Sequence, residues 1–356
     1  MTGAFPTERG SASHEAPGPV SLAAPLREAW NVALDFPWGS RPPILGMDGL
    51  LIGHHKGQLL AIDPTTRRVL WKRKANQPLV LHDGYVMTCE GDELRRFSLR
   101  TGELVYRMRT GAVESCVVEN GTLVAQAWNY EYDATAVYAW DWKTSQGLWS
   151  TPLGPNKASA LTALSELLVY QVGKAGASEA TTTARNIKTG NELWSRADLQ
   201  ALGDGNFLTV AADGLIAWVG DLLCIDPSTG RNRWRVNSAG GVPYVYQGRI
   251  YQCSWGGDYS VTDAKTGKSI FKASLNRTLP KSLQRAGPSN VAFVSETHVF
   301  IGAENGALFG FTRDKGEYVF NFHLPGAHKF SEVVCLDGRA YHRSGFHRLS
   351  CLEPRS

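Results

Sequence analysis

Histidines in two short segments are the side chains of this sequence that could bind a metal ion. The segment GHHKG holds His54 and His55, and the segment YHRSGFH holds His342 and His347. Imidazole nitrogens from two neighbouring loops can share one ion. Adjacent residues of a strand point to opposite faces, however, so His54 and His55 do not readily bind the same ion. We therefore expect histidines on surface loops and predict no metal site, with a metal site as the alternative.

Signatures of common catalytic sites do not occur in the sequence. It has no Gly-x-Ser-x-Gly elbow, no phosphate-binding Gly-x-x-x-x-Gly-Lys loop, no His-Glu-x-x-His and no Gly-x-Gly-x-x-Gly. Scattered carboxylates such as Glu90, Asp92, Glu131 and Asp133 are expected to be solvated loop charges. A carboxylate pair for glycoside chemistry depends on a geometry that the sequence does not give. The sequence favours a non-catalytic protein, with no catalytic residue assigned.

Composition excludes several classes of protein. The chain has 356 residues, of which 43% are hydrophobic, so it can bury a sizeable core. Its net charge of +4 is too mild for a dedicated nucleic-acid binder. No apolar run approaches the ~20 residues that a membrane helix needs. We expect a monomer that contacts neither a membrane nor nucleic acid.

The cysteines and the N-terminal segment indicate a cytoplasmic protein. Six cysteines stand far apart, most of them within apolar runs: Cys89, Cys116, Cys224, Cys253, Cys335 and Cys351. We expect buried free thiols in a reducing compartment. The N-terminal segment lacks the apolar stretch of a secretory signal, and it is rich in Ser, Ala, Gly and Pro. It predicts a disordered arm over residues 1–26.

One sequence pattern recurs about every 40 residues. An apolar run ends in Asp or a similar residue, a Thr-Gly-like turn follows, and an aromatic residue stands four positions later. The copies end at Trp71, Tyr106, Trp149, Trp194, Trp234, Phe271 and Phe320. Most copies are preceded by a second turn of the Asp-Gly or Asn-Gly kind, which tolerates positive φ in a two-residue hairpin. The fourth and seventh units have LSE and SET there instead, which weakens those two hairpin predictions. Four short strands per unit are typical of a propeller blade.

The two ends of the chain carry complementary fragments of this unit. The final segment CLEPRS aligns with CIDPST and stops before the turn glycine and the aromatic residue. Near the other end, REAWNVAL carries Trp30 with no strands of its own unit before it. We predict an all-β fold, an eight-bladed β-propeller of four-stranded antiparallel blades whose last blade is closed by the N-terminal strand. The propeller is expected to be one domain over residues 27–356.

An Asp, a Thr-Gly turn and a Trp, repeated around eight blades, resemble the quinoprotein-type (PQQ-like) propeller family over about residues 27–356. The resemblance implies that Trp30 and the seven later aromatic residues pack between blades and that the glycine permits the turn. Quinone-dependent dehydrogenases of this family resemble one another in a vicinal disulfide, a calcium site and a catalytic Asp. No two cysteines are adjacent here, so we predict no cofactor. The family's outer-membrane assembly lipoprotein needs a lipidated cysteine near its start, whereas the first cysteine here is Cys89.

Among the members of that family, the chain most resembles the cofactor-free cytoplasmic ones, which look like protein-binding platforms. Some of these are encoded beside bacterial toxins and serve as immunity proteins. We therefore predict a non-catalytic scaffold that binds another protein with an acidic surface, as an immunity protein that neutralises a bacterial toxin. An enzyme acting on a small molecule or a carbohydrate at the channel mouth is the alternative.

One rim of the propeller is the predicted binding surface. In a propeller, the connectors after the fourth strands and the loops between second and third strands share one rim, and long loops on a rigid scaffold often carry function. These segments combine Lys and Arg with aromatic residues outside the blade core, and Trp, Tyr and Arg supply most interface hot spots. The candidate binding residues are Trp38, Arg41, Trp128, Tyr130, Tyr132, Trp255, Lys281 and Arg285.

Overall fold

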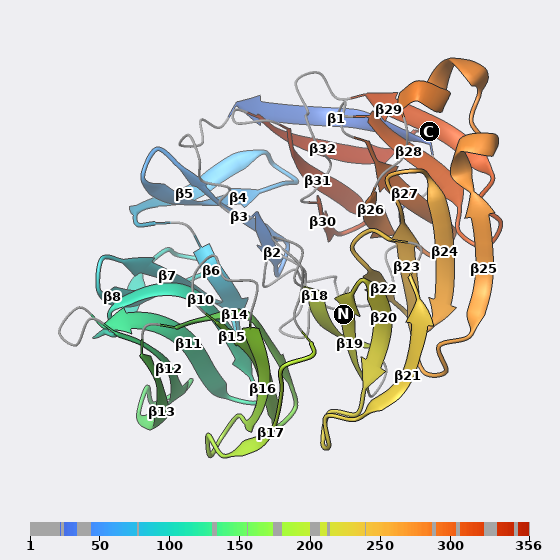
Figure 1. Cartoon of the computed structure of the whole chain (residues 1–356). Coiled ribbons are helices and arrows are strands. Elements are labelled where there is room, and N and C mark those ends of the chain that lie inside the picture. Colours follow the sequence, from blue (N-terminus) through green and yellow to red (C-terminus); the bar gives the residue numbers. More distant parts are fainter. Residues whose placement is uncertain are drawn as a thin grey trace.

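The described residues form a ring of eight four-stranded antiparallel sheets, the blades of a propeller (Figure 1). This computed structural model describes residues 22, 25–33, 44–76, 78–129, 134–154, 156–173, 180–199, 207–211, 214–238, 240–286, 290–303, 307–323, 333–344 and 348–355. The predicted all-β eight-bladed fold is confirmed. No helix among these residues is long and apolar enough to cross a membrane.

The first four blades follow one another along the chain, each from its innermost to its outermost strand. Blade 1 comprises β2 (Leu45–Met47), β3 (Leu50–His55), β4 (Gln58–Asp63) and β5 (Arg68–Lys74). Blade 2 comprises β6 (Pro78–His82), β7 (Tyr85–Glu90), β8 (Glu93–Ser98) and β9 (Leu104–Arg109). Blade 3 comprises β10 (Ala112–Glu119), β11 (Thr122–Asn129), β12 (Ala134–Asp141) and β13 (Gly147–Gly154). Blade 4 comprises β14 (Lys157–Leu164), β15 (Leu167–Gly173), β16 (Ala180–Asn186) and β17 (Glu192–Arg196).

In the described part of the chain, the remaining blades include two short helices and the closure of the ring. Blade 5 comprises β18 (Phe207–Ala211), β19 (Gly214–Val219), β20 (Asp221–Ile225) and β21 (Asn232–Asn237). Blade 6 comprises β22 (Tyr244–Tyr246), β23 (Arg249–Cys253), β24 (Asp258–Asp263) and β25 (Ser269–Ser274), followed by the 3-10 helices η2 (Leu275–Arg277) and η3 (Lys281–Ala286). Blade 7 comprises β26 (Asn290–Val294), β27 (His298–Gly302), β28 (Ala307–Thr312) and β29 (Tyr318–His323). Blade 8 comprises β30 (Val333–Leu336), β31 (Arg339–Ser344), β32 (Arg348–Pro354) and β1 (Leu26–Ala33).

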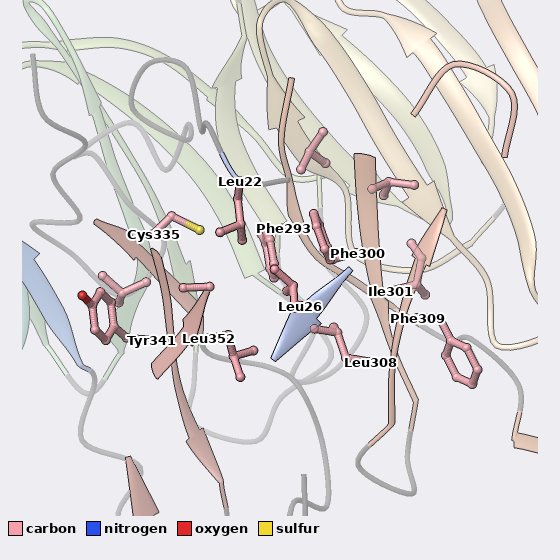
Figure 2. Close-up of a cluster of buried hydrophobic side chains, with 14 of the residues drawn as sticks. Leu22, Leu26, Phe293, Phe300, Ile301, Leu308, Phe309, Cys335, Tyr341 and Leu352 are labelled. Carbon is pink, nitrogen blue, oxygen red and sulfur yellow. The ribbon is translucent and has the colours of Figure 1, made fainter. Parts of the chain in front are cut away.

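The N-terminal strand β1 closes blade 8, as predicted from the complementary fragments. It pairs antiparallel with β32, so that Trp30 lies opposite Cys351. The innermost strand β2 of blade 1 contacts both β6 of blade 2 and β30 of blade 8, which joins the two ends of the ring. Leu22 and Leu26 are buried in a cluster with Phe293 and Phe300 of blade 7 (Figure 2). Packed residues therefore begin before the predicted domain start, and residues 1–21 of the predicted arm lie outside the described part of the chain.

The two weaker hairpin predictions are confirmed by the strand pairing. In blade 4, Leu164 pairs with Leu167 across a turn in which Ser165 takes a φ of 52°. In blade 7, Val294 pairs with Val299 across the segment that holds SET. Ser165 accepts the left-handed conformation that Asp-Gly or Asn-Gly turns adopt more readily. The hairpins form because both flanking strands are buried between blades, and this packing overrides the turn residue.

A β-bulge stands directly before the aromatic residue on the outer strand of each blade. The register shifts at Leu70 before Trp71, at Leu193 before Trp194, and at the corresponding position of the other blades. Strand β1 has the same shift at Ala29, directly before Trp30, so it is built like the other outer strands. A bulge turns the chain locally and re-aims the next side chain. Here it directs the aromatic ring toward the next blade.

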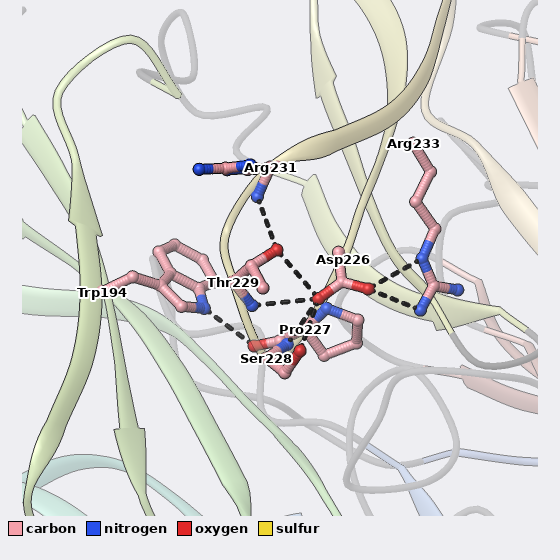
Figure 3. Close-up of polar contacts among 7 residues, drawn as sticks. All are labelled: Trp194, Asp226, Pro227, Ser228, Thr229, Arg231 and Arg233. Atoms are coloured by element: carbon pink, nitrogen blue, oxygen red, sulfur yellow. Dashed lines mark hydrogen bonds and ion pairs between the residues drawn. The ribbon is translucent and has the colours of Figure 1, made fainter.

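The aromatic ring packs on a glycine of the next blade. A Cβ atom added to Gly230 of blade 5 would lie 2.7 Å from the ring of Trp194 in blade 4. The Trp194 indole N–H also donates to the carbonyl of Pro227, at 2.7 Å (Figure 3). The same pairing of ring, glycine and carbonyl joins three further blade pairs, through Trp71 with Gly102, Trp149 with Gly190, and Trp234 with Gly267. The glycine is required twice over, because its φ is positive and its face is covered by the ring.

Blades 2 and 3 are joined by the same kind of contact between a ring and a turn, but different residues make it. Tyr106 replaces the tryptophan, and Ser145 at a φ of 58° replaces the glycine. The Arg96 guanidinium lies 4.8 Å from the ring centroid of Trp142 and 5.3 Å from that of Tyr106. Its Nη1 donates to the carbonyl of Trp142 at 2.5 Å, which corresponds to the bond that an indole N–H makes elsewhere. A cation between aromatic rings thus takes the place of the tryptophan.

The turn that presents each glycine is held by an oxygen of the side chain four residues earlier, which belongs to a carboxylate, an amide or, at Ser98, a hydroxyl. Asp226 Oδ1 accepts the backbone N–H groups of Ser228 and Thr229 at 3.0 and 2.9 Å (Figure 3). Bonds from the Ser228 hydroxyl and from Arg233 hold the pKa of the Asp226 carboxyl well below its usual range. Asn186 makes the equivalent backbone bonds in blade 4, so a neutral side chain can build the same turn.

Removal of β1 is expected to destabilise the whole ring. Deletion of residues 27–34 removes a full strand of ladder bonds and Trp30, and should lower the free energy of unfolding by at least about 3 kcal/mol. Deletion of residues 1–20 should leave it unchanged, because the described contacts begin at Leu22. Urea denaturation of both truncated chains measures this. Equal stability of the two chains would contradict closure by β1.

Gly230→Ala should cost more than a glycine substitution at a turn that no ring covers. Gly121 has the same φ of 69° as Gly230 but no atom within 4 Å of an added Cβ, so Gly121→Ala is a matched control. Both variants pay for an alanine at positive φ, roughly 1 kcal/mol. Gly230→Ala should lose about 1–3 kcal/mol more through the clash with Trp194. Thermal denaturation compares the variants, and equal losses would show that the ring contact contributes nothing.

Asp226→Asn should change the pH dependence of stability. The pKa of Asp226 is lower in the folded chain than the value of about 3.9 in an unfolded chain, so its stabilisation is present above about pH 4 and is lost as the pH falls through the folded pKa. The variant should be less stable than the wild type at neutral pH, because it loses the charge that pairs with Arg233. The difference should shrink below about pH 4. Urea denaturation across pH measures it, and a constant difference would refute the role of ionisation.

Candidate functional site

The described part of the predicted rim is best defined at blade 6. The register places Cys253 opposite Tyr259 and Asp258 opposite Ser274, so the β23–β24 loop and the chain after β25 emerge at the same end of the sheet. We call residues 254–257 and the helical connector 275–286 together the blade-6 rim. The helices lie beyond the outer end of β25, at the edge of the ring (Figure 1).

The β23–β24 loop is a tight turn with a tryptophan at its tip. Ser254 N–H donates to the carbonyl of Asp258, and the Ser254 hydroxyl accepts the N–H groups of Gly256 and Asp258 at 3.2 and 3.0 Å. These bonds fix the backbone on both sides of Trp255. The Trp255 side chain is nevertheless 68% exposed, the largest exposure among the described large hydrophobic residues. A large apolar side chain is thus presented to solvent on a fixed backbone.

The helical connector is fastened to that loop. Asn276 Nδ2 donates to the Gly256 carbonyl at 2.7 Å, and Leu275 N–H donates to the Gly257 carbonyl at 2.8 Å. Leu275 and Leu279 are buried in the core cluster and anchor the connector. The connector therefore holds one position relative to Trp255.

Exposed cations surround the connector. Arg277 in η2 and Lys281 in η3 are exposed, and so is Lys272 within β25, just before the connector. Buried Leu275 and Leu279 hold the backbone that carries Arg277 and Lys281, and both cations are exposed to solvent. The blade-6 rim therefore combines a large apolar side chain with positive charge.

The structure separates the predicted binding residues into two groups. Trp255 and Lys281 both belong to the blade-6 rim, and Arg285 lies in η3. Trp128 is half-buried in β11 of blade 3, three blades away around the ring. Trp38, Arg41, Tyr130 and Tyr132 lie outside the described residues. Participation of all these residues in binding stays a prediction.

Two basic residues of the predicted rim are instead engaged with the neighbouring blade. Arg73 Nε donates to the carbonyl of Gly102 at 2.6 Å, and Arg196 Nη1 donates to the carbonyl of Gly230 at 2.6 Å. Each stands two residues after a tryptophan that covers the same glycine. Their spacing from Trp71 and Trp194 could have signalled a structural role.

The expectation of surface-loop histidines is wrong for His54 and His342. His54 is the penultimate residue of β3 and is buried, with its Nε2 at 3.1 Å from the carbonyl oxygen of Ala75. Burial lowers the pKa of His54, so the imidazole is neutral near pH 7. His342 is fully buried within β31, and His347 lies outside the described residues. Within the described ranges, no three His, Cys, Asp or Glu side chains gather to hold a metal ion.

The six cysteines are free and buried, as predicted. Burial raises the pKa of Cys253 to about 12 and that of Cys351 to about 11, so both thiols stay protonated near neutral pH. The vicinal disulfide that the family resemblance associates with quinone-dependent dehydrogenases has no counterpart among them. These residues do not fit that cofactor arrangement.

An apolar groove between blades 4 and 5 was missed by sequence reasoning. It has a volume of about 450 Å³ and is lined by Leu164, Leu167, Leu193 and Pro227, among others. Leu193 is the bulge residue before Trp194, and it is exposed. An apolar residue directly before the repeated aromatic residue is the sequence signal that could have indicated it.

The family is decided by a comparison with protein-family models. A PQQ-type model described as outer membrane protein assembly factor BamB matches residues 20–126, 55–204, 90–235 and 219–335, which together span well over half of the chain. The chain belongs to this PQQ-like family. No match is found among curated proteins.

Solved structures share the fold of this PQQ-like propeller. BamB from Moraxella catarrhalis is 15% identical, with a TM-score of 0.62 over 92% of this chain and 100% of that chain. A europium-containing methanol dehydrogenase is 11% identical, with a TM-score of 0.67 over 99% of this chain and 98% of that chain. The quinohemoprotein alcohol dehydrogenase of Comamonas testosteroni is 13% identical, with a TM-score of 0.65 over 99% of this chain and 82% of that chain. At such identities the likeness shows the fold alone.

Proposed function

We propose that this PQQ-like propeller is a non-catalytic scaffold that binds a partner protein on the blade-6 rim. The observation that carries the proposal is Trp255, which is 68% exposed on a loop whose backbone is fixed by hydrogen bonds. An exposed tryptophan on a preorganised loop suits an interface hot spot, because little conformational entropy is lost when it is buried.

The charge of the rim favours an acidic partner. Lys272, Arg277 and Lys281 are exposed around the connector. Their positive charge would attract an acidic surface and speed its association. The matching family model is described as BamB, an assembly factor. This description also favours a scaffold over an enzyme.

In its sharper form, the proposal makes the partner a bacterial toxin and this chain its cytoplasmic, monomeric immunity protein. The support is the resemblance to the cofactor-free members of the family, some of which serve as immunity proteins. Neutralisation would follow from a partner held on one face of a rigid ring. Long loops on such a face can cover a partner's active surface without any chemistry by the propeller.

Trp255→Ala should weaken partner binding at least tenfold, as expected for a hot-spot tryptophan. Leu70→Ala is the matched control, because Leu70 is an exposed apolar residue of blade 1, far from the rim. Its effect should stay within twofold. Affinity purification from the native host identifies the partner, and calorimetry with the purified partner measures both variants. In co-expression with a toxic partner, the wild-type chain should restore growth and Trp255→Ala should restore less.

Two outcomes would count against this proposal. If a stoichiometric partner binds both variants equally, the blade-6 rim is not its site. If no partner is captured while a small molecule or sugar raises the melting temperature, the enzyme alternative gains.

A further inference from the structure

The junction between blades 8 and 1 departs from the pairing of tryptophan and glycine that joins four other blade pairs. The aromatic residue there is Trp30, and the turn position that is Gly102, Gly190, Gly230 or Gly267 elsewhere is occupied by Arg67. Arg67 keeps the left-handed conformation of those glycines, with a φ of 61°. A non-glycine residue in this conformation costs about 1 kcal/mol.

The side chain of Arg67 prevents the usual closure of the junction. At Gly102 and Gly230, a Cβ atom would lie only 2.5 and 2.7 Å from the covering ring. Trp30 therefore cannot cover the Arg67 turn as closely. Its ring is half-buried, at 6.0 Å from that of Tyr341 between centroids. No described residue accepts its indole N–H, unlike those of the tryptophans that cover glycines.

The result is an open notch between blades 8 and 1, with a volume of about 290 Å³. Arg27, Arg67 and Arg339 line it together with Trp30 and Thr65. The notch is a small cleft whose walls are polar, apart from Ala29, Trp30 and Pro64. Its size suits a small molecule or one or two side chains of a peptide.

The charges of the notch favour a ligand with a net charge of about −1. Glu28 and Glu353 also line the notch, so the described part of its wall holds three guanidinium groups and two carboxylates. Glu353 is already shared, at 2.9 Å from Arg27 Nη2 and 3.4 Å from Arg339 Nε. No carboxylate among the described residues pairs with Arg67, which is exposed. Its planar fork of donors matches the two oxygens of a carboxylate.

We propose that this notch binds a carboxylate, with the guanidinium of Arg67 as its main donor and the Trp30 indole N–H beside it. The carboxylate belongs either to a small free acid or to an acidic side chain of a peptide segment. This site is separate from the blade-6 rim and does not depend on the function proposed for it. Two glutamates in the wall disfavour a dianionic phosphate, whose charge they would repel.

Calorimetry with the full chain tests the site with three probes: free glutamate, a short blocked peptide with one glutamate, and inorganic phosphate. We expect one carboxylate probe to bind and phosphate to bind at least tenfold more weakly. A peptide that binds at least tenfold more tightly than glutamate assigns the site to a protein segment. The reverse order assigns it to a free acid.

The variant Arg67→Gly tests whether carboxylate binding can be lost while the fold stays stable. The glycine relieves the backbone and allows Trp30 to cover the turn, so the melting temperature should stay the same or rise while carboxylate binding falls at least tenfold. Arg68→Ala, which removes an equal charge at the next residue, should change binding less than twofold. Arg67→Lys keeps the charge and the backbone conformation but loses the fork, and should also bind at least tenfold more weakly.

Three results would overturn the proposal. The first is that neither carboxylate probe binds. The second is that phosphate binds as tightly as the carboxylate probes. The third is that Arg67→Lys and Arg67→Gly both bind the carboxylate as tightly as the wild type does. If Arg67→Gly melts at a lower temperature than the wild type, Arg67→Lys alone decides the outcome.

Discussion

The packing of one aromatic ring on the turn of the next blade is the interaction on which the whole propeller depends. A single blade has two apolar faces and cannot bury either alone, so each face must be covered by a neighbour. Trp194 achieves this for blades 4 and 5 by covering Gly230 and donating its indole N–H to Pro227. The bulge before each such aromatic residue supplies the rotation that the contact needs. The hydrophobic clusters accordingly lie between blades, as layers around the ring.

What the junction requires is a flat group over the turn and a donor to the turn carbonyl, and different residues can supply them. In blade 6, Phe271 lies against Gly316 of blade 7 but has no donor. Tyr259 supplies it instead, through a hydroxyl that donates to the carbonyl of Arg313 at 3.2 Å. The scaffold therefore tolerates changes of residue type without changes of geometry. The junction of blades 8 and 1, where the long side chain of Arg67 occupies the turn position, is open.

A rigid ring of this kind separates stability from function. Trp255 extends from blade 6 into solvent, and the notch opens where one junction is incomplete. Both features use groups that the ring already holds in place, either through hydrogen bonds to the backbone or through burial of nearby leucines. Preorganised groups of this kind lose little entropy on binding.

The sequence by itself determined the blade count, the two turns of each blade and the closure by the strand that carries Trp30. These features follow from local rules of turn conformation and strand alternation that are repeated along the chain, and repetition makes a weak local signal strong. The tertiary structure decided which polar residues are buried, as at His54 and His342, because burial depends on the neighbouring blade and not on local sequence. It also decided that Trp255 is exposed and that Arg67 opens a junction. The burial of a residue such as His54 depends on a distant part of the chain, here Ala75, and no local pattern records that contact.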